Sequence, residues 1–547
     1  MGSKQSSDSV EIEKEDVIFD ENVTADHLEN GALSPEHREY LLARHGTLDL
    51  DPIPSMDPAD PLNWPSWKKD INLVLISFHA MMTTFTAASV IPVYETFSEI
   101  FHISMTQASY LTSIQILVLG VSPIFWKPIS NRFGRRPIWL ISALGSFACN
   151  LGNAYAYSYA TQVVVRVIGA MMISPAIAIS SAVVTESYFA SQRASKMGIW
   201  TLMVTLGPPT GPFIMGFVAY HTGSWQWIYW ILAITNAVQF ILYIFLSPET
   251  LYNREQPQAA VEPPQAGEKK GGSFVKQYLT FGRKGPKPLS LQDFTGFIKL
   301  FAFPNILLPA ISYAIVFNFA NVMGTVEIPQ IFTPRFHFNP QQIGLNFLAL
   351  IIGSVLGEVL GGIGSDSWMR WGYKRSGNTK HPEPEFRLWL SYLGYATVIC
   401  GLVVFTVQTD SIKSYNVSPI IGLAISSFGN QIITTVCTTY AVDCHHNHSA
   451  GVGVFINLIR STWGFLGKAN PHMFLEAFMN PKLTSVLIAG PLWFPDMFNN
   501  LGLRGAGGLM AGIVAACSLL PTIFIQFKGK AIRERRYVKE MEDASQN

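Results

Sequence analysis

The sequence predicts an all-α membrane protein whose twelve transmembrane helices form two pseudo-symmetric halves of six. Hydrophobic residues make up 49% of the 547 residues and charged residues only 14%, which is typical of a bundle embedded in lipid rather than of soluble domains. Apolar runs long enough to cross a hydrocarbon core of ~30 Å, which takes about 20 helical residues, recur from Ile71 to Phe527. One long polar stretch divides these runs into two sets, which indicates two halves.

The apolar runs divide the chain into five parts. Residues 1–70 are polar and acidic and are expected to form a mobile cytoplasmic N-terminal tail, and residues 528–547 a cytoplasmic C-terminal tail. Residues 248–302, rich in proline, glycine and lysine, are expected to form a flexible cytoplasmic linker. The first half, 71–247, has expected spans at 71–94, 108–130, 137–157, 161–184, 198–220 and 226–247. The second half, 303–527, has them at 303–326, 341–364, 386–407, 417–442, 450–474 and 504–527.

The orientation follows from lysine and arginine, which stay on the cytoplasmic side of a membrane. One set of loops, together with the linker and the C-terminal tail, carries most of the basic residues, whereas the other loops hold little beyond Arg335, Lys413, Lys482 and Arg504. We therefore place both termini in the cytoplasm of a multi-pass protein, and expect the membrane to be the plasma membrane. The sequon at Asn416 then faces outside and is a glycosylation candidate.

Composition and motifs disfavour several other classes of protein. A formal net charge of +1, with basic residues scattered among loops, argues against a nucleic-acid partner, which needs a clustered basic surface. The five cysteines show no CxxC spacing, and the sequence has no GxxxxGK[ST] phosphate loop for an ATP-driven pump. We therefore expect a protein that is not an enzyme, that holds no metal and no cofactor, and that draws its energy from an ion gradient.

A short polar and basic pattern occurs at the corresponding place in each half. Residues 127–136 read KPISNRFGRR after the second span, and residues 362–370 read GIGSDSWMR after the eighth. Both patterns run from small or apolar residues through polar to basic ones, at the cytoplasmic end of the second helix of their half. A duplicated six-helix unit accounts for two such loops in register.

These loops resemble the GxLaDrxGRr signature of the major facilitator superfamily. In the fifth span, GPPTGPFIMG at 207–216 resembles the antiporter-type GxxxGPxxGG motif, and Arg166 in the fourth span resembles the arginine of an RxxqG motif. The resemblance covers the chain from about Asp51 to Tyr537. It implies a major facilitator fold.

Four further segments are similar to fungal transporters of the drug:proton antiporter type. They are HGTLDLDP at 45–52, DPADPLNWPSWKK at 57–69, SPETLY at 247–252 and PEFRL at 384–388. The last of them, with Asp443 and Cys444, also resembles the yeast polyamine and histidinol permease. This likeness implies a proton-coupled transporter with a small-molecule substrate.

The resemblance makes the loops after the second and eighth spans candidates for gating. In the family, an aspartate of this loop pairs with basic residues and a helix end and holds one gate closed. Here Asn131 replaces that aspartate and Lys127 replaces a glycine, so we expect a weaker latch in the first half. The candidate gating residues are Asn131, Arg132, Gly134, Arg135, Arg136 and Asp366.

Polar side chains at mid-membrane depth are the candidates for lining the solute pathway. For any single amide, a hydrogen bond to a neighbouring helix is at least as good an interpretation. The substrate-cavity candidates are His79, Gln115, Tyr313, Asn318, Asn430, Gln431, Asn457 and Arg460.

Charged side chains inside the spans carry more weight, because an arginine or glutamate at depth costs about 2.5 kcal/mol or more unless it is paired or hydrated. Glu358, two turns before Asp366, and Arg166, in the outer part of the fourth span, are the proton-coupling candidates. A partly desolvated carboxylate at Glu358 could bind and release a proton near neutral pH. The alternative for Glu358 is a static salt bridge with a loop arginine.

The fifth span combines glycines, which let backbones approach closely, with prolines, which bend a helix. Its motif residues Gly207, Gly211, Pro212 and Gly216 therefore predict close helix packing, and through the resemblance an antiporter.

The function expected from these observations is proton-coupled secondary transport of a small organic solute by a monomer in the lipid bilayer. Export of a drug, toxin or secondary metabolite is the first hypothesis. Uptake of a polyamine or another organic cation is the second, and it needs acidic groups in the cavity, for which Glu358, Glu327 and Asp443 are the evident candidates. A nutrient sensor on the same fold is disfavoured, because the C-terminal tail is short.

Overall fold

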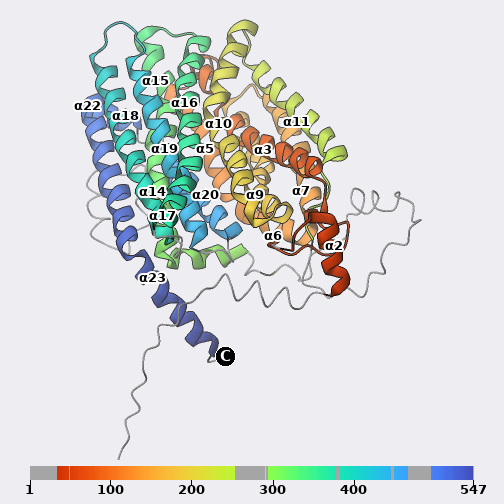
Figure 1. Ribbon diagram of the computed structural model, residues 1–547. Helices are drawn as coiled ribbons and strands as arrows, with labels where there is room; N and C mark the ends of the chain where they lie inside the picture. Colours follow the sequence, from red (N-terminus) through yellow and green to blue (C-terminus); the bar gives the residue numbers. More distant parts are fainter. Residues whose placement is uncertain are drawn as a thin grey trace, which may run out of the picture.

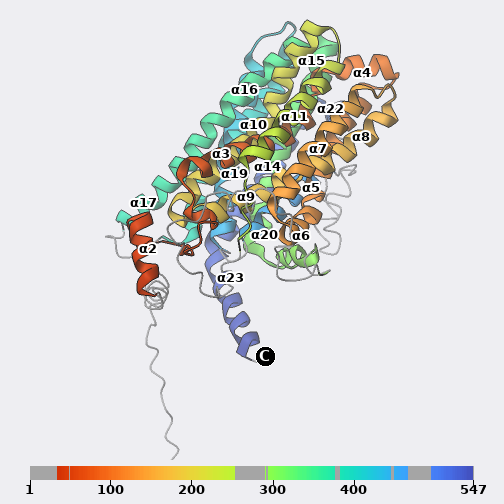
Figure 2. The same cartoon turned by 90° about the vertical axis from the view of Figure 1, so that its right-hand side faces the viewer.

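The computed structural model describes residues 34–48, 50–252, 290, 294–375, 382–444, 449–465 and 494–545. Within these residues the chain forms helices and no strands, and the long helices lie side by side in one bundle (Figures 1 and 2). Nine of the described helices or helix series are long and apolar enough to cross a membrane, or ten with a bent pair counted as one span. Two further helices, α7 (Arg135–Ala154) and α20 (Ser449–Phe465), are not among these ten and take the third and eleventh places in the order of spans.

The predicted fold class, two halves of six membrane helices, is confirmed. The first half contains α3 (Ser66–Ala88) with η2 (Ile91–Val93) and α4 (Tyr94–Phe101), α5 (Met105–Val121) with α6 (Pro123–Phe133), α7, α8 (Tyr159–Ile173) with α9 (Pro175–Ser187), α10 (Ala190–Thr222) and α11 (Gln226–Leu246). The second half contains α14 (Pro304–Phe317) with η4 (Asn318–Met323) and α15 (Gly324–Phe336), α16 (Pro340–Val359) with η5 (Leu360–Gly364) and α17 (Ser365–Arg375), η6 (Pro384–Leu390) with α18 (Ser391–Ser411), α19 (Ser418–Asp443), α20, and α22 (Phe494–Val514) with η9 (Ala515–Leu519) and α23 (Leu520–Ser545).

Several spans are interrupted where the chain locally departs from α-helical hydrogen bonding. Pro123 and Pro175 stand at the first turns of α6 and α9, where a proline needs no intrahelical hydrogen bond, and α5 meets α6 at an angle of 42°. In the second half, η4, η5 and η9 are π-helical segments, which in membrane and soluble helices are frequent at functional sites. Segment η4 contributes to the lining of a cavity between the two halves.

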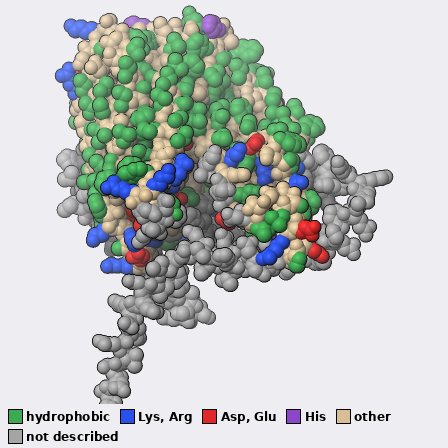
Figure 3. Space-filling view, viewed as in Figure 1, with side chains coloured by type: hydrophobic (Ala, Val, Ile, Leu, Met, Phe, Trp, Pro, Cys, Tyr) green, Lys and Arg blue, Asp and Glu red, His purple; other side chains and the backbone are tan. Residues whose placement is uncertain are grey.

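The surface of the bundle is apolar along its length and charged at its ends. Figure 3 shows hydrophobic side chains over most of the bundle, with lysine and arginine gathered mainly near its lower end. We call that end, where α6 and α17 lie, the basic end, and the end that holds Arg335 and Lys413 the opposite end (Figure 1). Exposed Ile, Leu and Phe side chains along the spans, such as Ile241 and Leu356, suit contact with lipid chains.

The two halves meet along α10 and α16 and along α5 and α20. Near the opposite end, Gly216 of α10 lies against α16, where an added Cβ would come within 2.5 Å of the carbonyl oxygen of Pro340 and 3.1 Å of Gly344 Cα. Gly207, nearer the middle of α10, faces α3 instead, because its added Cβ would lie 1.9 Å from Thr84 Oγ1. The glycines of the fifth span therefore let α10 approach one helix of its own half and one of the other half.

Part of the N-terminal segment is folded, although the sequence indicated a mobile tail. Helix α2 (Pro35–His45) begins at the N-cap Ser34 and ends at Gly46, whose φ is +75°. The segment after it is fixed to the first half, since Ser55 Oγ donates a hydrogen bond to Tyr252 Oη and the His45 ring packs edge-on against Phe189. The described residues 34–48 and 50–65 thus form a small structure at the basic end.

The C-terminal segment continues the last span as helix α23, beyond the expected boundary at residue 527. Arg533 anchors it, donating hydrogen bonds to Glu383 at 2.9 Å and to Glu385 at 3.2 Å. Burial acts to raise the pKa of Glu383, but the hydrogen bonds from Lys530 and Arg533 outweigh it, so that pKa lies below its usual value.

Candidate functional site

A central cavity lies between the two halves. Its lining comes from α3, η2, α5, α9 and α10 of the first half and from α14, η4, α15 and α20 of the second half. Most lining side chains are small or apolar, and the polar ones come mainly from η4, α15 and α20 on the second-half side. Secondary transporters hold their solutes near the midplane between such repeats, so this cavity is the candidate solute site.

Three of the substrate-cavity candidates form one cluster at this cavity. Arg460 donates a hydrogen bond from Nη1 to Tyr313 Oη at 3.2 Å and from Nη2 to Asn457 Oδ1 at 2.6 Å. Its guanidinium also lies over the ring of Phe317, 4.7 Å from the centroid. Asn457 Nδ2 in turn donates to the carbonyl oxygen of Leu119, 3.4 Å away in the first half. The cluster therefore connects the cavity wall to the contact between the halves.

Glu358 and Gln431, placed in different candidate groups, are hydrogen-bonded to each other. Gln431 Nε2 donates to Glu358 Oε2 at 2.6 Å, and Thr435 Oγ1 donates to the same oxygen at 2.9 Å. The salt bridge considered as the alternative is not observed, since no lysine or arginine of the described residues pairs with Glu358. Glu358 is thus a partly buried carboxylate whose described partners are neutral.

Glu327, one of the acidic residues expected to matter for cation uptake, is a fully buried carboxylate. It lies in the first turn of α15 and is 1% exposed. Its described hydrogen-bond partner is Gln330, whose Nε2 donates to Glu327 Oε1 at 3.1 Å. Gln330 Oε1 also accepts a hydrogen bond from Thr106 Oγ1, 3.3 Å away in the first half. A buried carboxylate with one neutral partner is costly, so Glu327 joins Glu358 as a candidate proton carrier.

Arg166 is 2% exposed and binds only neutral acceptors in the described part of the chain. Its guanidinium donates to the carbonyl oxygens of Leu111 at 3.3 Å and Ala87 at 3.1 Å, and to Tyr229 Oη at 3.0 Å. Tyr229 Oη in turn donates a hydrogen bond to Gln162 Oε1 at 2.9 Å. Arg166 on α8 therefore ties together α3, α5 and α11. The fork of the guanidinium matches these spread acceptors.

The other cavity candidates are not among the described residues that line the central cavity. His79 is buried within the first half, where Nδ1 lies 2.9 Å from Tyr243 Oη and the ring packs beside Trp139. Gln115 lines a separate small pocket that also contains Arg166. Asn318 begins η4, and Asn430 is buried on α19 with no hydrogen-bond partner for either amide atom. The structure thus brings Tyr313, Asn457 and Arg460 together, but leaves His79 and Gln115 in the interior of the first half.

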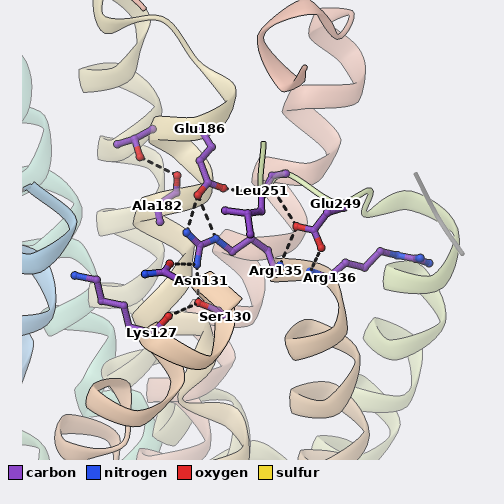
Figure 4. Close-up of polar contacts among 11 residues, drawn as sticks. Lys127, Ser130, Asn131, Arg135, Arg136, Ala182, Glu186, Glu249 and Leu251 are labelled. Carbon is purple, nitrogen blue, oxygen red and sulfur yellow. Dashed lines mark hydrogen bonds and ion pairs between the residues drawn. The ribbon is translucent and has the colours of Figure 1, made fainter. Parts of the chain in front are cut away.

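The loop after the second span forms a network around Arg135 (Figure 4). The guanidinium donates to Ser130 Oγ at 2.6 Å, to Asn131 Oδ1 at 2.7 Å, and to Glu186 Oε1 on α9 at 2.7 Å. Asn131 therefore accepts a hydrogen bond, as expected, while Glu186 supplies the charge that Asn131 lacks. Lys127 points away from this network in Figure 4.

Glu249, in the segment after α11, caps the start of α7. Its carboxylate accepts hydrogen bonds from the backbone N–H of Arg135 at 2.9 Å and of Arg136 at 3.2 Å. A carboxylate at a helix N-terminus satisfies free N–H groups and complements the helix dipole. Gly134 makes room for it, because its φ is +99° and an added Cβ would lie 2.3 Å from Glu249 Oε2. The glutamate of the SPETLY segment at 247–252 therefore serves as a helix cap.

The second half contains a network similar to that of Arg135. Its central arginine is Arg387, which comes from η6 and not from the loop itself. Arg387 of η6 donates to Ser365 Oγ at 2.7 Å and Asp366 Oδ1 at 3.1 Å, and its Nε lies 3.2 Å from Asp443 Oδ2 at the end of α19. Serine, Asx and acidic partners thus surround one arginine in each half, as the internal repeat implies. Asp443 lies in this network at the basic end and does not line the central cavity.

Each network makes its described contacts within its own half. It therefore holds together the helix ends of that half and does not join the two halves. We expect Glu186→Gln to lower the free energy of unfolding by about 2 kcal/mol, because it leaves the buried Arg135 without its carboxylate. Asn131→Asp, at an exposed position, should change it by less than about 1 kcal/mol. Thermal unfolding in detergent compares the two variants. An Asn131→Asp effect as large as that of Glu186→Gln would contradict this assignment of the charge.

The glycosylation candidate Asn416 lies exposed at the opposite end, where its Oδ1 accepts a hydrogen bond from the backbone N–H of Ser418 at 3.0 Å. Glycosylation there stays a prediction. Among the residues described, no group of three or more His, Cys, Asp or Glu side chains is arranged to hold a metal ion.

Comparison with known proteins gives one family. Residues 73–467 match the sequence model described as Major Facilitator Superfamily. The chain is 26% identical to the MFS transporter cpaT of Aspergillus oryzae, over 87% of this chain and 90% of that protein. It is 25% identical to the efflux pump radE of Floropilus chiversii, over 87% of this chain and 83% of that protein.

Solved structures resemble the chain in fold. The human organic anion transporter MFSD10 (TETRAN) superposes with a TM-score of 0.51 at 14% identity, covering 84% of this chain and 99% of that one. A bacterial homologue of the human lysosomal transporter Spinster gives 0.52 at 14% identity, covering 86% and 99%. At this identity the likeness concerns the arrangement of helices alone.

Proposed function

Because the chain belongs to the Major Facilitator Superfamily, we propose that this membrane transporter couples proton movement to the export of a drug, toxin or secondary metabolite. The transporter class and the membrane location follow from the family. Proton coupling, the direction of transport and the kind of solute are the proposal, together with a monomeric state and a place in the plasma membrane.

Alternating access is supported by the construction of the two halves. The halves surround one cavity, and each holds its own helix ends together through the Arg135 or the Arg387 network. Near the opposite end they are packed closely where Gly216 meets Pro340 and Gly344. Halves that are internally fixed can rock as bodies about the cavity and so expose it to either side in turn.

Proton coupling is supported by the observation that carries the proposal: the second half holds one buried and one partly buried carboxylate, both with neutral described partners. Glu358 accepts hydrogen bonds from Gln431 and Thr435, and Glu327 accepts one from Gln330. A carboxylate in this setting is stabilised by taking up a proton, and regains its charge when a change of conformation hydrates it.

Export rather than uptake is supported by the relative radE, which is named an efflux pump. Uptake of an organic cation is the weaker hypothesis, because a cation needs acidic groups at its site. Among the described residues that line the central cavity, none is acidic. A nutrient sensor has no support from relatives that are named as transporters or pumps.

The test of the proposed function uses the full chain in proteoliposomes. An imposed proton gradient should drive solute movement in the opposite direction, and solute movement should in turn change the internal pH. Export of a labelled solute that ignores the proton gradient, in liposomes that hold the gradient, would reject proton coupling.

The orientation gives a separate prediction, since the basic end should face the cytoplasm. An epitope inserted near Gln265, which lies outside the described residues, should be reached by antibody only after the membrane is permeabilised. An epitope at Tyr415, exposed at the opposite end, should be reached in intact cells. The reverse pattern of labelling would invert the orientation.

A further inference from the structure

The central cavity contains a positive charge without a described counter-ion. Arg460 is the only charged residue among the described residues that line it. Its described partners, Tyr313, Asn457 and the ring of Phe317, are all neutral. Its Nε has no hydrogen-bond partner although it is shielded from solvent. Arg460 is partly buried, and a guanidinium shielded from water without a counter-ion is costly, so the site favours an anion beside it.

Asn321 provides a second, independent observation at the same cavity. It lies in the π-helical segment η4, lines the cavity, and is 1% exposed. Neither Nδ2 nor Oδ1 of its amide has a hydrogen-bond partner. Buried amides are nearly always satisfied, and those left open call for a partner that is absent from the protein itself. Together, Arg460 Nε and Asn321 Nδ2 offer two free donors.

The rest of the cavity suits an apolar body. On the first-half side six of the lining residues are apolar: Ala87, Ala88, Ile91, Ile116, Leu119 and Ile177. Pro208, Thr84 and Thr112 complete this side, and the two threonine hydroxyls are hydrogen-bonded within the first half. The apolar side chains gain from contact with hydrocarbon or aromatic surface. The cavity is therefore polarised, with mostly apolar groups on the first-half side and the open donors of Arg460 and Asn321 on the second-half side.

We propose that the transported solute is an organic anion, whose carboxylate or similar anionic group binds Arg460 and Asn321 while its apolar body lies against the first half. This inference rests on the proposed function, because it names the solute class of that same cavity. Arginine suits this role, since its planar fork binds a carboxylate through two parallel hydrogen bonds. An organic cation would meet the charge of Arg460 with repulsion and leave both donors unpaired.

The test compares solutes that share an apolar body and differ in head group. Suitable triples are indole-3-acetate, indole-3-acetamide and tryptamine, with equivalent naphthyl and octyl triples. Binding to the purified full chain in lipid nanodiscs is measured by calorimetry. For at least one body, the anion should bind at least about tenfold more tightly than the amine, as expected for a hydrogen-bonded charge. Binding by none of the anions, or by the amines at least as tightly for every body, overturns the inference.

Two variants and a control locate the effect. Arg460→Gln should weaken binding of the anion about tenfold and leave the neutral amide nearly unchanged. Asn321→Leu replaces an unsatisfied buried amide by an apolar group of similar size, so the variant should fold. It should still weaken binding of the anion. Arg504→Gln, at an exposed pair with Asp410, is the matched control and should change nothing. If Arg460→Gln does not fold, Asn321→Leu decides, and undiminished anion binding in a folded variant overturns the inference.

Failure of this inference can be told from failure of the proposed function. Arg460-dependent binding of anions without any proton-driven transport would reject proton coupling and keep the solute class. Proton-driven export of tryptamine that is unaffected by Arg460→Gln would keep the transport function and reject the solute class.

Discussion

Replacing Arg166 with lysine is expected to abolish transport almost as completely as replacing it with leucine. The guanidinium reaches acceptors on three other helices of the first half, the carbonyl oxygens of Ala87 and Leu111 and the hydroxyl of Tyr229. A single ammonium group carries the same charge but cannot reach acceptors that lie in three directions. Each charge-assisted hydrogen bond that is lost contributes about 1.5–3 kcal/mol, so either variant should lower the free energy of unfolding by more than about 3 kcal/mol.

Transport and thermal stability are measured together on both Arg166 variants. Arg504→Lys is the control, because Arg504 is an exposed arginine at the same end whose described carboxylate partner is Asp410. It should behave as the unaltered protein. If Arg166→Lys is as stable as the unaltered protein and keeps substantial transport, the charge matters rather than the fork, and a role in proton movement or in binding an anion regains support.

The spans could be predicted from the sequence because a run of about 20 apolar residues has few alternatives to crossing a bilayer. Their ends were less predictable. The seventh span was placed at 303–326, yet α15 continues to Phe336 through Pro329 and Pro334. Glu327 is the first residue after the expected boundary, so the expected spans leave it outside the membrane. The apolar residues that follow Glu327 were the available indication that the span continues past it.

Partners of the site residues could be predicted only where they are near in sequence. The gating loop was recognised from its local pattern, but Glu186 and Glu249 are 51 and 114 residues from Arg135. No local sequence pattern relates these two glutamates to Arg135. The acceptors of Arg166 are largely backbone carbonyls, which every residue has, so no sequence pattern could indicate them. The weaker latch expected from Asn131 rested on one residue, whereas the charge of the network comes from Glu186.

The second large effect is expected for Glu358→Gln, which should keep solute exchange across the membrane and lose accumulation against a gradient. The glutamine is nearly isosteric with the glutamate and resembles its protonated form. Its amide oxygen can still accept the hydrogen bonds that Gln431 and Thr435 donate to Glu358 Oε2. Its NH₂ group would then take the place of Oε1, which lies beside Gly198. A Cβ added to Gly198 would still be 3.9 Å from Glu358 Oε1, so the NH₂ group has room there. The variant should therefore fold normally and remove only the ability to ionise.

Proteoliposomes that contain Glu358→Gln separate three roles of this carboxylate. If it carries the proton, labelled solute exchanges between the two sides while proton flux and uphill movement stop. If it binds a cationic solute, exchange itself weakens, which would also contradict the anionic solute inferred from Arg460. If it only supports the packing of α16 against α19, the amount of folded protein falls and the coupling of what remains is normal.

Glu99→Gln and Glu327→Gln complete the Glu358 experiment. Glu99 is exposed at the opposite end, so its replacement should leave exchange and accumulation unchanged. Glu327 is the more deeply buried carboxylate, and Gln330 connects it to Thr106 of the first half. Loss of accumulation in Glu327→Gln with normal coupling in Glu358→Gln would move the proton site from α16 to α15, because each variant removes one ionisable group and leaves the other in place. Normal proton-driven accumulation in both variants would remove coupling from the two carboxylates altogether.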